Sequence, residues 1–106
     1  MDTMTINIAK DFSRYPLGRD DNDGPYNGEK FRKSFLVPAL QRHKKVAVYL
    51  DGPKGYGSSF LEEAFGGLVR KENFTKADLQ ERLSIYYDDK VYELYKKEAW
   101  EYINEA

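Results

Sequence analysis

Three short segments of the chain have the hydrophobic patterns of β-strands. Residues 3–8 (TMTINI) and residues 82–87 (RLSIYY) alternate polar with apolar side chains, whereas residues 44–51 (KKVAVYLD) are apolar at nearly every central position. Alternation indicates a strand with one buried face, and a continuous apolar run indicates a strand that is covered on both faces. The segment 44–51 is therefore expected to be the central strand of a sheet.

Helical spacing of apolar side chains predicts three longer elements between and after these strands. They cover residues 29–43, residues 59–69 and residues 89–106, and a short helix with Thr75 as its N-cap is expected within residues 74–83. Pro38 lies inside the first of these helices, where it must kink the helix or restart it as a first-turn residue.

The resulting order, β-α-β-α-β-α, predicts an α/β fold with a small mixed or parallel sheet and a helical cover. The 106 residues fit one domain, residues 1–106, without a repeat or a linker. The pattern leaves open whether the third strand runs parallel or antiparallel to the others.

Composition limits the chemistry that the chain can perform. There is no cysteine and one histidine, His43, so disulfides and thiolate metal sites are excluded, and neither a metal nor another cofactor is expected. His43 follows the first helix among basic residues and is interpreted as an exposed helix terminus. The formal net charge is −1 without a basic block, which argues against a nucleic-acid partner.

The chain shows no sign of export or membrane insertion. Its first ten residues lack the pattern of a signal peptide, and no apolar run approaches the roughly 20 residues that cross a bilayer. We therefore expect a cytoplasmic protein without a membrane partner. Nine tyrosines exceed what a core of this size needs, so some of them and Trp100 are candidates for an interface, and a homodimer is one arrangement that would use them.

A glycine-rich loop, GPKGYGSS at residues 52–59, lies between the central strand and the next helix. The spacing of Gly52 and Gly57 imitates a nucleotide-binding P-loop, but Ser58 stands where that motif needs its lysine, and Lys54 lies inside the loop. A small nucleotide- or phosphate-binding module, or an enzyme using the loop 52–57, remains an alternative.

The two serines after this loop allow two compatible interpretations. Ser59 and Glu62 have the spacing of a capping box, in which the serine hydroxyl would stabilise the helix start by about 1 kcal/mol. A helix N-terminus also tolerates a phosphoryl group, so Ser58 and Ser59 are candidates for modification.

The charged residues around these elements do not form a recognisable catalytic or calcium site. The acidic stretch with Asp20, Asp21 and Asp23 has Pro25 where an EF-hand needs glycine. Two arginines, Arg19 and Arg32, flank it and would bind a carboxylate or phosphate or pair with these aspartates. Glu62 and Glu63 are expected on different sides of their helix, so they do not form a convergent acid–base pair, and no enzyme activity is predicted.

Residues 50–70, LDGPKGYGSSFLEEAFGGLVR, resemble the signature of the STAS-like domains of unknown function, small bacterial proteins related to anti-sigma factor antagonists. Residues 18–19, 27–32 and 38–40 fit the same family. In the antagonists, a serine at this strand-to-helix turn is phosphorylated by a partner kinase of the GHKL ATPase type, which breaks their complex. The resemblance places that role on Ser58 or Ser59, with Ser59 the closer match, although Gly57 and Phe60 differ from the flanking residues of the antagonists.

The resemblance implies a non-enzymatic regulatory domain that binds a protein partner, with serine phosphorylation as the switch. Because some relatives lie on mobile elements, it also offers a phage- or defence-associated interaction protein as an alternative. The predicted partner-binding residues are Arg19, Gly55, Tyr56, Gly57, Ser58, Ser59, Phe60, Glu62 and Glu63.

Overall fold

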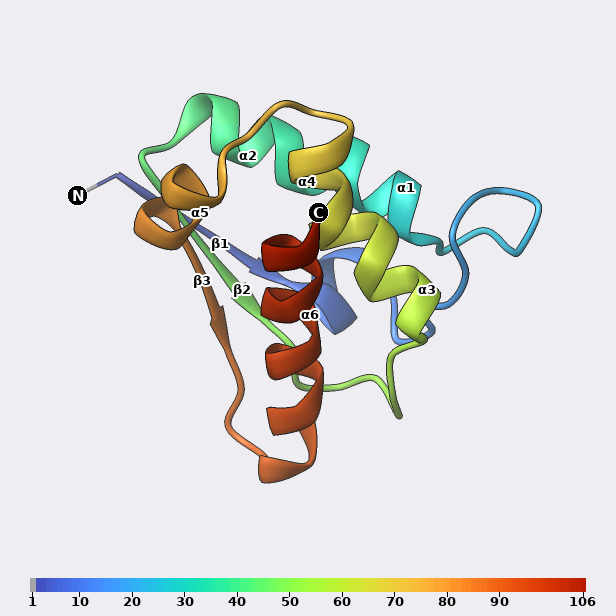
Figure 1. The fold of residues 1–106 in the computed structure, drawn as a ribbon. Helices are drawn as coiled ribbons and strands as arrows, with labels where there is room; N and C mark the ends of the chain where they lie inside the picture. The colour runs from blue at the N-terminus through green and yellow to red at the C-terminus, as the bar shows by residue number, and fades with distance from the viewer. Residues whose placement is uncertain (1) are drawn as a thin grey trace.

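A computed structural model describes residues 2–106 and contains one sheet of three parallel strands in the order β1-β2-β3 (Figure 1). The strands are β1 (Thr3–Asn7), β2 (Lys45–Tyr49) and β3 (Leu83–Tyr86). Their register places Thr5, Ala47 and Ser84 side by side in the middle of the sheet. The expected central position of the second strand is confirmed, and the third strand proves to be parallel.

Helices connect and follow the strands in the predicted order. In chain order, the helical segments are a π-helical turn (Ile8–Phe12), α1 (Gly28–Phe31), a π-helical stretch (Arg32–Leu36), α2 (Val37–Arg42), α3 (Ser58–Leu61), a second π-helical stretch (Glu62–Gly66), α4 (Gly67–Arg70), α5 (Lys76–Arg82), a 3-10 turn (Lys90–Tyr92) and α6 (Glu93–Glu105). α1 and α2 thus form one continuous helical segment, as do α3 and α4, each interrupted by a π-helical stretch.

Of the two outcomes predicted for Pro38, a kink or a restart of the helix, the structure shows the restart, in the segment α1–α2. Pro38 is in the first turn of α2, and the amide of Val37 donates to the carbonyl of Arg32, which is the wider hydrogen bond of a π-helix. Because proline has no N–H to offer, the helix accommodates it where the regular ladder is already broken. Thr75 caps α5 as predicted, with its hydroxyl 3.0 Å from the amide of Asp78.

The helices pack against one face of the sheet only. Ile6, Val46, Val48 and Ile85 point from the strands into the core, where the largest helical contributions are Phe31, Phe60, Phe65, Leu36, Leu40, Leu61 and Leu68. In Figure 1 the long helical segments lie above and to the right of the strands. The expectation that β2 is covered on both faces was wrong, because the described core lies on one face only. Ala47, on the opposite face, is outside this core and lines a hollow, although its own side chain is only 8% exposed between its neighbours.

The segment predicted as the C-terminal helix, residues 89–106, is not helical in one piece. Ala99 and Ile103 in α6 are buried, whereas Val91 is 66% exposed. Val91 belongs to the 3-10 turn that precedes α6, and the tighter winding of that turn rotates it away from the buried side. Trp100, named above as an interface candidate, is partly buried against the core.

Candidate functional site

The loops that follow the three strands converge at the carboxyl edge of the sheet. In parallel α/β sheets this edge is where ligands and partners bind, because the connections leave a crevice there. The central loop, residues 50–57, follows β2 and leads directly into α3. In this loop, the carboxylate of Asp51 accepts hydrogen bonds from the backbone amides of Asp88 and Asp89 at 2.8 and 2.9 Å. These bonds tie the loop after β3 to the loop after β2.

Two tyrosines hold the glycine-rich loop in place, Tyr56 within the loop and Tyr92 in the 3-10 turn before α6. The Tyr92 hydroxyl donates to the carbonyl of Pro53 at 2.5 Å and accepts the amide of Gly52 at 3.0 Å. The Tyr56 hydroxyl donates to the carbonyl of Leu50 at 2.6 Å. Burial, before any neighbouring charge, raises the pKa of Tyr56 far above its ordinary value, so this hydroxyl stays a donor. Gly52 has φ +124°, a conformation that side chains rarely adopt.

The two serines lie at the start of α3, exposed to solvent, and neither caps the helix. The N-cap residue is Gly57, and no side-chain capping bond is present there. The predicted capping box between Ser59 and Glu62 was therefore wrong. The Glu62 carboxylate instead reaches Arg19 at 2.5 Å and also pairs with Arg70.

A network of charged side chains lies behind the serines and holds three segments together. Glu63 is only 1% exposed, and its carboxylate binds the guanidinium of the fully buried Arg32 at 2.7 Å. Lys71 at 2.9 Å and Arg19 at 3.2 Å contact the same carboxylate. Burial alone would raise the pKa of Glu63, but the hydrogen bonds from Arg32, Lys71 and Arg19 outweigh it and lower the pKa to about 2.

This network corrects one expectation and decides between two alternatives. Glu62 and Glu63, expected on different sides of the helix, both reach the same nitrogen of Arg19. Of the alternatives left open for Arg19 and Arg32, pairing with the nearby aspartates is not found among the salt bridges of residues 2–106. Both arginines bind carboxylates of the chain itself, and Arg32 binds those of Glu63 and Glu72. The network therefore connects the loop before α1 to the segment α3–α4.

A groove of about 430 Å³ runs beside the serine turn, between the loop before α1 and the glycine-rich loop. Two of its side chains are unusually exposed for apolar groups, Tyr15 at 67% and Leu17 at 56%. None of the described residues that line it is acidic; they are Arg14, Tyr15, Leu17, Lys54, Gly55, Tyr56, Gly57 and Tyr95. The two loops contact each other directly, since Gly57 donates its amide to the carbonyl of Pro16 at 3.5 Å. The groove is thus an apolar surface with a positive margin.

The family model of the STAS-like domain of unknown function (DUF4325) matches residues 27–91. The chain belongs to this family. No curated protein and no solved structure matches the chain.

The STAS-like domain places the predicted partner-binding residues in two different environments. Ser58 and Ser59 lie exposed beside the groove, and Gly55 and Gly57 line it. The side chains of Tyr56, Phe60 and Glu63 are at most 7% exposed; Phe60 and Glu63 support this surface from below, and Tyr56 also contributes to the wall of the groove. Arg19 and Glu62 lie between these two groups, paired with each other.

Sequence analysis did not identify the groove residues Arg14, Tyr15, Leu17 and Lys54. A signal was available in the run RYPL at residues 14–17, where an aromatic and an aliphatic side chain flank a proline inside an otherwise polar loop. What the sequence could not show is that this run lies against Gly57, about 40 residues away, because only the folded chain brings them together.

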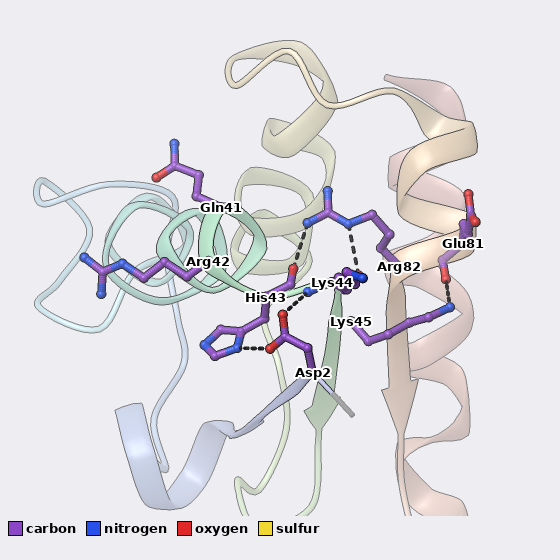
Figure 2. A pocket seen from close by; sticks show the side chains of 8 residues that line it. All are labelled: Asp2, Gln41, Arg42, His43, Lys44, Lys45, Glu81 and Arg82. Carbon is purple, nitrogen blue, oxygen red and sulfur yellow. Dashed lines mark hydrogen bonds and ion pairs between the residues drawn. The ribbon is translucent and has the colours of Figure 1, made fainter.

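A second hollow of the STAS-like domain, about 450 Å³, lies at the opposite, amino edge of the sheet (Figure 2). There the guanidinium of Arg82 donates hydrogen bonds to three backbone carbonyls, those of Leu40, of His43 (2.9 Å) and of Lys44 (3.1 Å). These bonds satisfy carbonyl groups at the C-terminal end of α2 and just after it. The imidazole of His43 lies 2.7 Å from the Asp2 carboxylate, and the side chain of Arg42 points away from this cluster. His43 is the C-cap of α2, which confirms its predicted place at a helix terminus.

Two further observations concern the described residues as a whole. Residues 2–106 contain no group of three or more histidine or acidic side chains arranged to hold a metal ion. None of their helices combines the length and the apolar character that a membrane span requires.

Proposed function

We infer that this STAS-like domain is a non-enzymatic regulatory domain that binds a protein partner at the groove beside the serine turn. The partner class that family resemblance favours is a GHKL-type ATPase or kinase, with Ser59 or Ser58 as its phosphorylation site. In this proposal the unmodified domain binds the partner, and the phosphorylated domain binds it more weakly.

The observation that carries the proposal is the pair of exposed serines, which make no capping bond and border an apolar groove. A hydroxyl that stabilises its own helix is expensive to modify, since loss of a cap costs about 1 kcal/mol. Ser58 and Ser59 have no such role at the helix start. Exposed apolar side chains next to them, Tyr15 and Leu17, are the kind of surface that proteins use to bind other proteins.

The polar groups around the turn support binding rather than catalysis. An enzyme needs a nucleophile, a base and an orienting group that converge on one point. Here Asp51 accepts two backbone amides, and Glu62 and Glu63 are engaged by arginines and Lys71. Burial by itself would raise the pKa of Glu62, but the hydrogen bonds from Arg19 and Arg70 lower it below its ordinary value, so it is a poor base at neutral pH.

Phosphorylation at this turn would change the surface and leave the fold intact. A phosphate adds about two negative charges, and the first turn of a helix stabilises negative charge through its free amides. The same phosphate would lie next to Gly57 in the wall of a groove whose charged residues are Arg14 and Lys54. A partner segment that relies on these cations would then have to compete with the phosphate for them.

The proposal is tested by co-purification from the native host with a tag on Ala106, followed by binding measurements with the recovered ATPase or kinase. The baits are wild type, Ser59→Asp and Ser58→Ala/Ser59→Ala, each examined by intact mass. Ser34→Asp is the matched control, because Ser34 is also exposed and helical but lines a different hollow with Phe35 and Pro38.

We expect a stoichiometric partner on wild type and on the double alanine variant, with at least a tenfold weaker complex for Ser59→Asp, equivalent to about 1.4 kcal/mol. A mass increase of one phosphoryl group should occur on wild type and be absent from the double alanine variant. Ser34→Asp should bind as wild type does. Equal binding by all four baits without a mass increase would reject the phosphorylation switch, and absence of any partner would reject the interaction domain.

The positive margin of the groove also favours the alternative of a small phosphate- or nucleotide-binding module. This alternative predicts saturable binding of ATP or inorganic phosphate in calorimetry that is lost in Lys54→Ala. One feature weighs against it: the amide of Gly52, which a phosphate-binding loop would direct at its ligand, is already bound to the Tyr92 hydroxyl.

A further inference from the structure

The network of charged side chains behind the serine turn holds more cations than carboxylates. Its ion pairs join four cationic side chains to three carboxylates: Arg19, Arg32, Arg70 and Lys71 against Glu62, Glu63 and Glu72. One positive charge is therefore in excess, and the network lies directly behind two exposed hydroxyls at the start of α3. An additional anion at this position would be stabilised by the excess charge.

Arg19 is free to take a new partner, because both carboxylates that it contacts are also bound by other cations. Glu62 pairs with Arg70 through both of its oxygens. Glu63 lies 2.7 Å from the guanidinium of Arg32. The side chain of Arg19 is itself 42% exposed, so water can reach it and a new anion can as well. Moving this guanidinium deprives neither carboxylate of its last cation.

Ser59 lies on the face of the helix that Arg19 contacts. Glu62 and Glu63 follow Ser59 by three and four positions, and residues at these two spacings are neighbours on a helix surface. Helical side chains also lean towards the N-terminus of their helix. The two carboxylates, and the Arg19 nitrogen that both of them bind, therefore lie over the turn that contains Ser59. A group attached to the hydroxyl of Ser59 would be placed beside this guanidinium.

We propose that Arg19 binds a phosphoryl group on Ser59, and that its guanidinium turns from the two glutamates to the phosphate. This inference rests on the proposed function, which supplies the modified serine. In the transfer, Oγ of Ser59 bonds to the γ-phosphorus of ATP held by the partner kinase, the hydroxyl proton is released to solvent, and ADP leaves. The phosphate is the stronger partner for a guanidinium, because it offers about two negative charges and three acceptor oxygens.

The backbone at Arg19 stays in place during this exchange. Its amide donates to the Asp23 carboxylate at 2.8 Å, and its carbonyl accepts the amide of Glu29 at 3.0 Å. Only the side chain has to move, so the loop before α1 remains bound to α3 (Figure 1), now through the phosphate in place of Glu62. Without this arginine, the phosphate would face two carboxylates one turn away, and like charges at that spacing repel each other.

The proposal is tested on the full chain with phosphoserine inserted at position 59 during translation, so that neither kinase nor partner is needed. Phosphorus NMR follows the second ionisation of the phosphate between about pH 5 and about pH 8. Binding by Arg19 should lower the pKa of this phosphate by at least about 0.5 from its ordinary value of about 6. Arg19→Gln should abolish the shift, and Arg19→Lys, which keeps the charge without the planar fork, should retain part of it.

Two controls separate Arg19 from other groups near the turn. Arg14→Gln and Lys54→Gln remove the cations of the groove, and each should change the phosphate pKa by less than about half as much as Arg19→Gln, because both side chains are exposed and screened by solvent. Phosphoserine at position 58 should titrate independently of Arg19, because this position is rotated by about 100° around the helix and lies near Tyr102 of α6.

An ordinary pKa for phosphoserine at position 59 would overturn the proposal, as would a larger effect of either groove variant than of Arg19→Gln. Circular dichroism of every variant excludes unfolding as the cause. The outcome can be told apart from that of the proposed function. If co-purification recovers no kinase while the titration depends on Arg19, the regulatory function is rejected and the contact is confirmed. If the partner responds to phosphorylation while the titration ignores Arg19, the contact alone is rejected.

Discussion

Replacing Gly67 by alanine should destabilise the protein, although the same change is favourable in most helices. Gly67 has φ −61° and ψ −24°, values that alanine adopts freely, and alanine is preferred over glycine in a helix by about 1 kcal/mol. The obstacle is the buried guanidinium of Arg32. A methyl group on Gly67 would fall inside the contact distance of its Nη1 and within 3.1 Å of its Cδ and Cζ.

The size of the effect follows from what Arg32 must give up. Moving the guanidinium separates it from Glu63, and breaking a buried ion pair on one side costs about 3–5 kcal/mol. Subtracting the helix preference leaves a net loss of about 3 kcal/mol, a large part of the 5–15 kcal/mol that is typical for such a domain. With a urea m-value of about 1.5 kcal/mol/M, the unfolding midpoint should fall by about 2 M.

The neighbouring Gly66 provides a matched control. A methyl group there would lie 2.9 Å from Oε2 of Glu62, the end of a flexible side chain, and 3.3 Å from the carbonyl of Tyr102. Gly66→Ala should therefore change the free energy of unfolding by about 1 kcal/mol at most. If Gly67→Ala proves as stable as wild type, the buried position of Arg32 is refuted. In the background Arg32→Met/Glu63→Leu, the penalty for Gly67→Ala should disappear, since there is no guanidinium to displace.

Three further predictions concern the site. The pKa of Glu63 is about 2 in the folded protein, against an ordinary 4.5. Above pH 4.5 the ionised carboxylate therefore adds about 3 kcal/mol to the free energy of unfolding, and this contribution is lost as the pH falls from 4.5 towards 2. Urea unfolding across that pH range should be steeply pH-dependent for wild type and less so for Glu63→Gln; equal slopes would contradict the assignment. Tyr92→Phe should cost about 1–2 kcal/mol and speed hydrogen exchange at Gly52, because one hydroxyl serves both Pro53 and that amide; exchange as slow as in wild type would show that the tyrosine does not hold the loop. Ser59→Ala should change stability by less than about 0.5 kcal/mol, because Gly57 is the N-cap, whereas a loss of 1 kcal/mol or more would restore the capping role.

The local pattern of the chain was sufficient to predict its elements and their order. Alternation of period two located β1 and β3, the apolar run located β2 at the centre, and helical spacing located the segments that become α1–α2, α3–α4 and α6. These features depend on neighbours within a few residues, which is why a single sequence reveals them. The position of the serine turn, between a strand and a helix at the carboxyl edge, follows from the same information.

What the sequence could not determine depends on residues that meet only in the folded chain. Glu62 has the spacing of a capping box with Ser59. The carboxylate of Glu62 nevertheless binds Arg19, which lies 43 positions earlier in the chain. A hydrogen bond between two charged groups is stronger than the local capping bond that it replaces. The groove needs two loops about 40 residues apart, and the pairing of Arg32 with Glu63 needs two helices. The apolar run of β2 predicted a cover on both faces, but which face the helices cover is decided by how the whole chain closes around its core. The uncovered face, with Ala47 at its centre, exists for that reason.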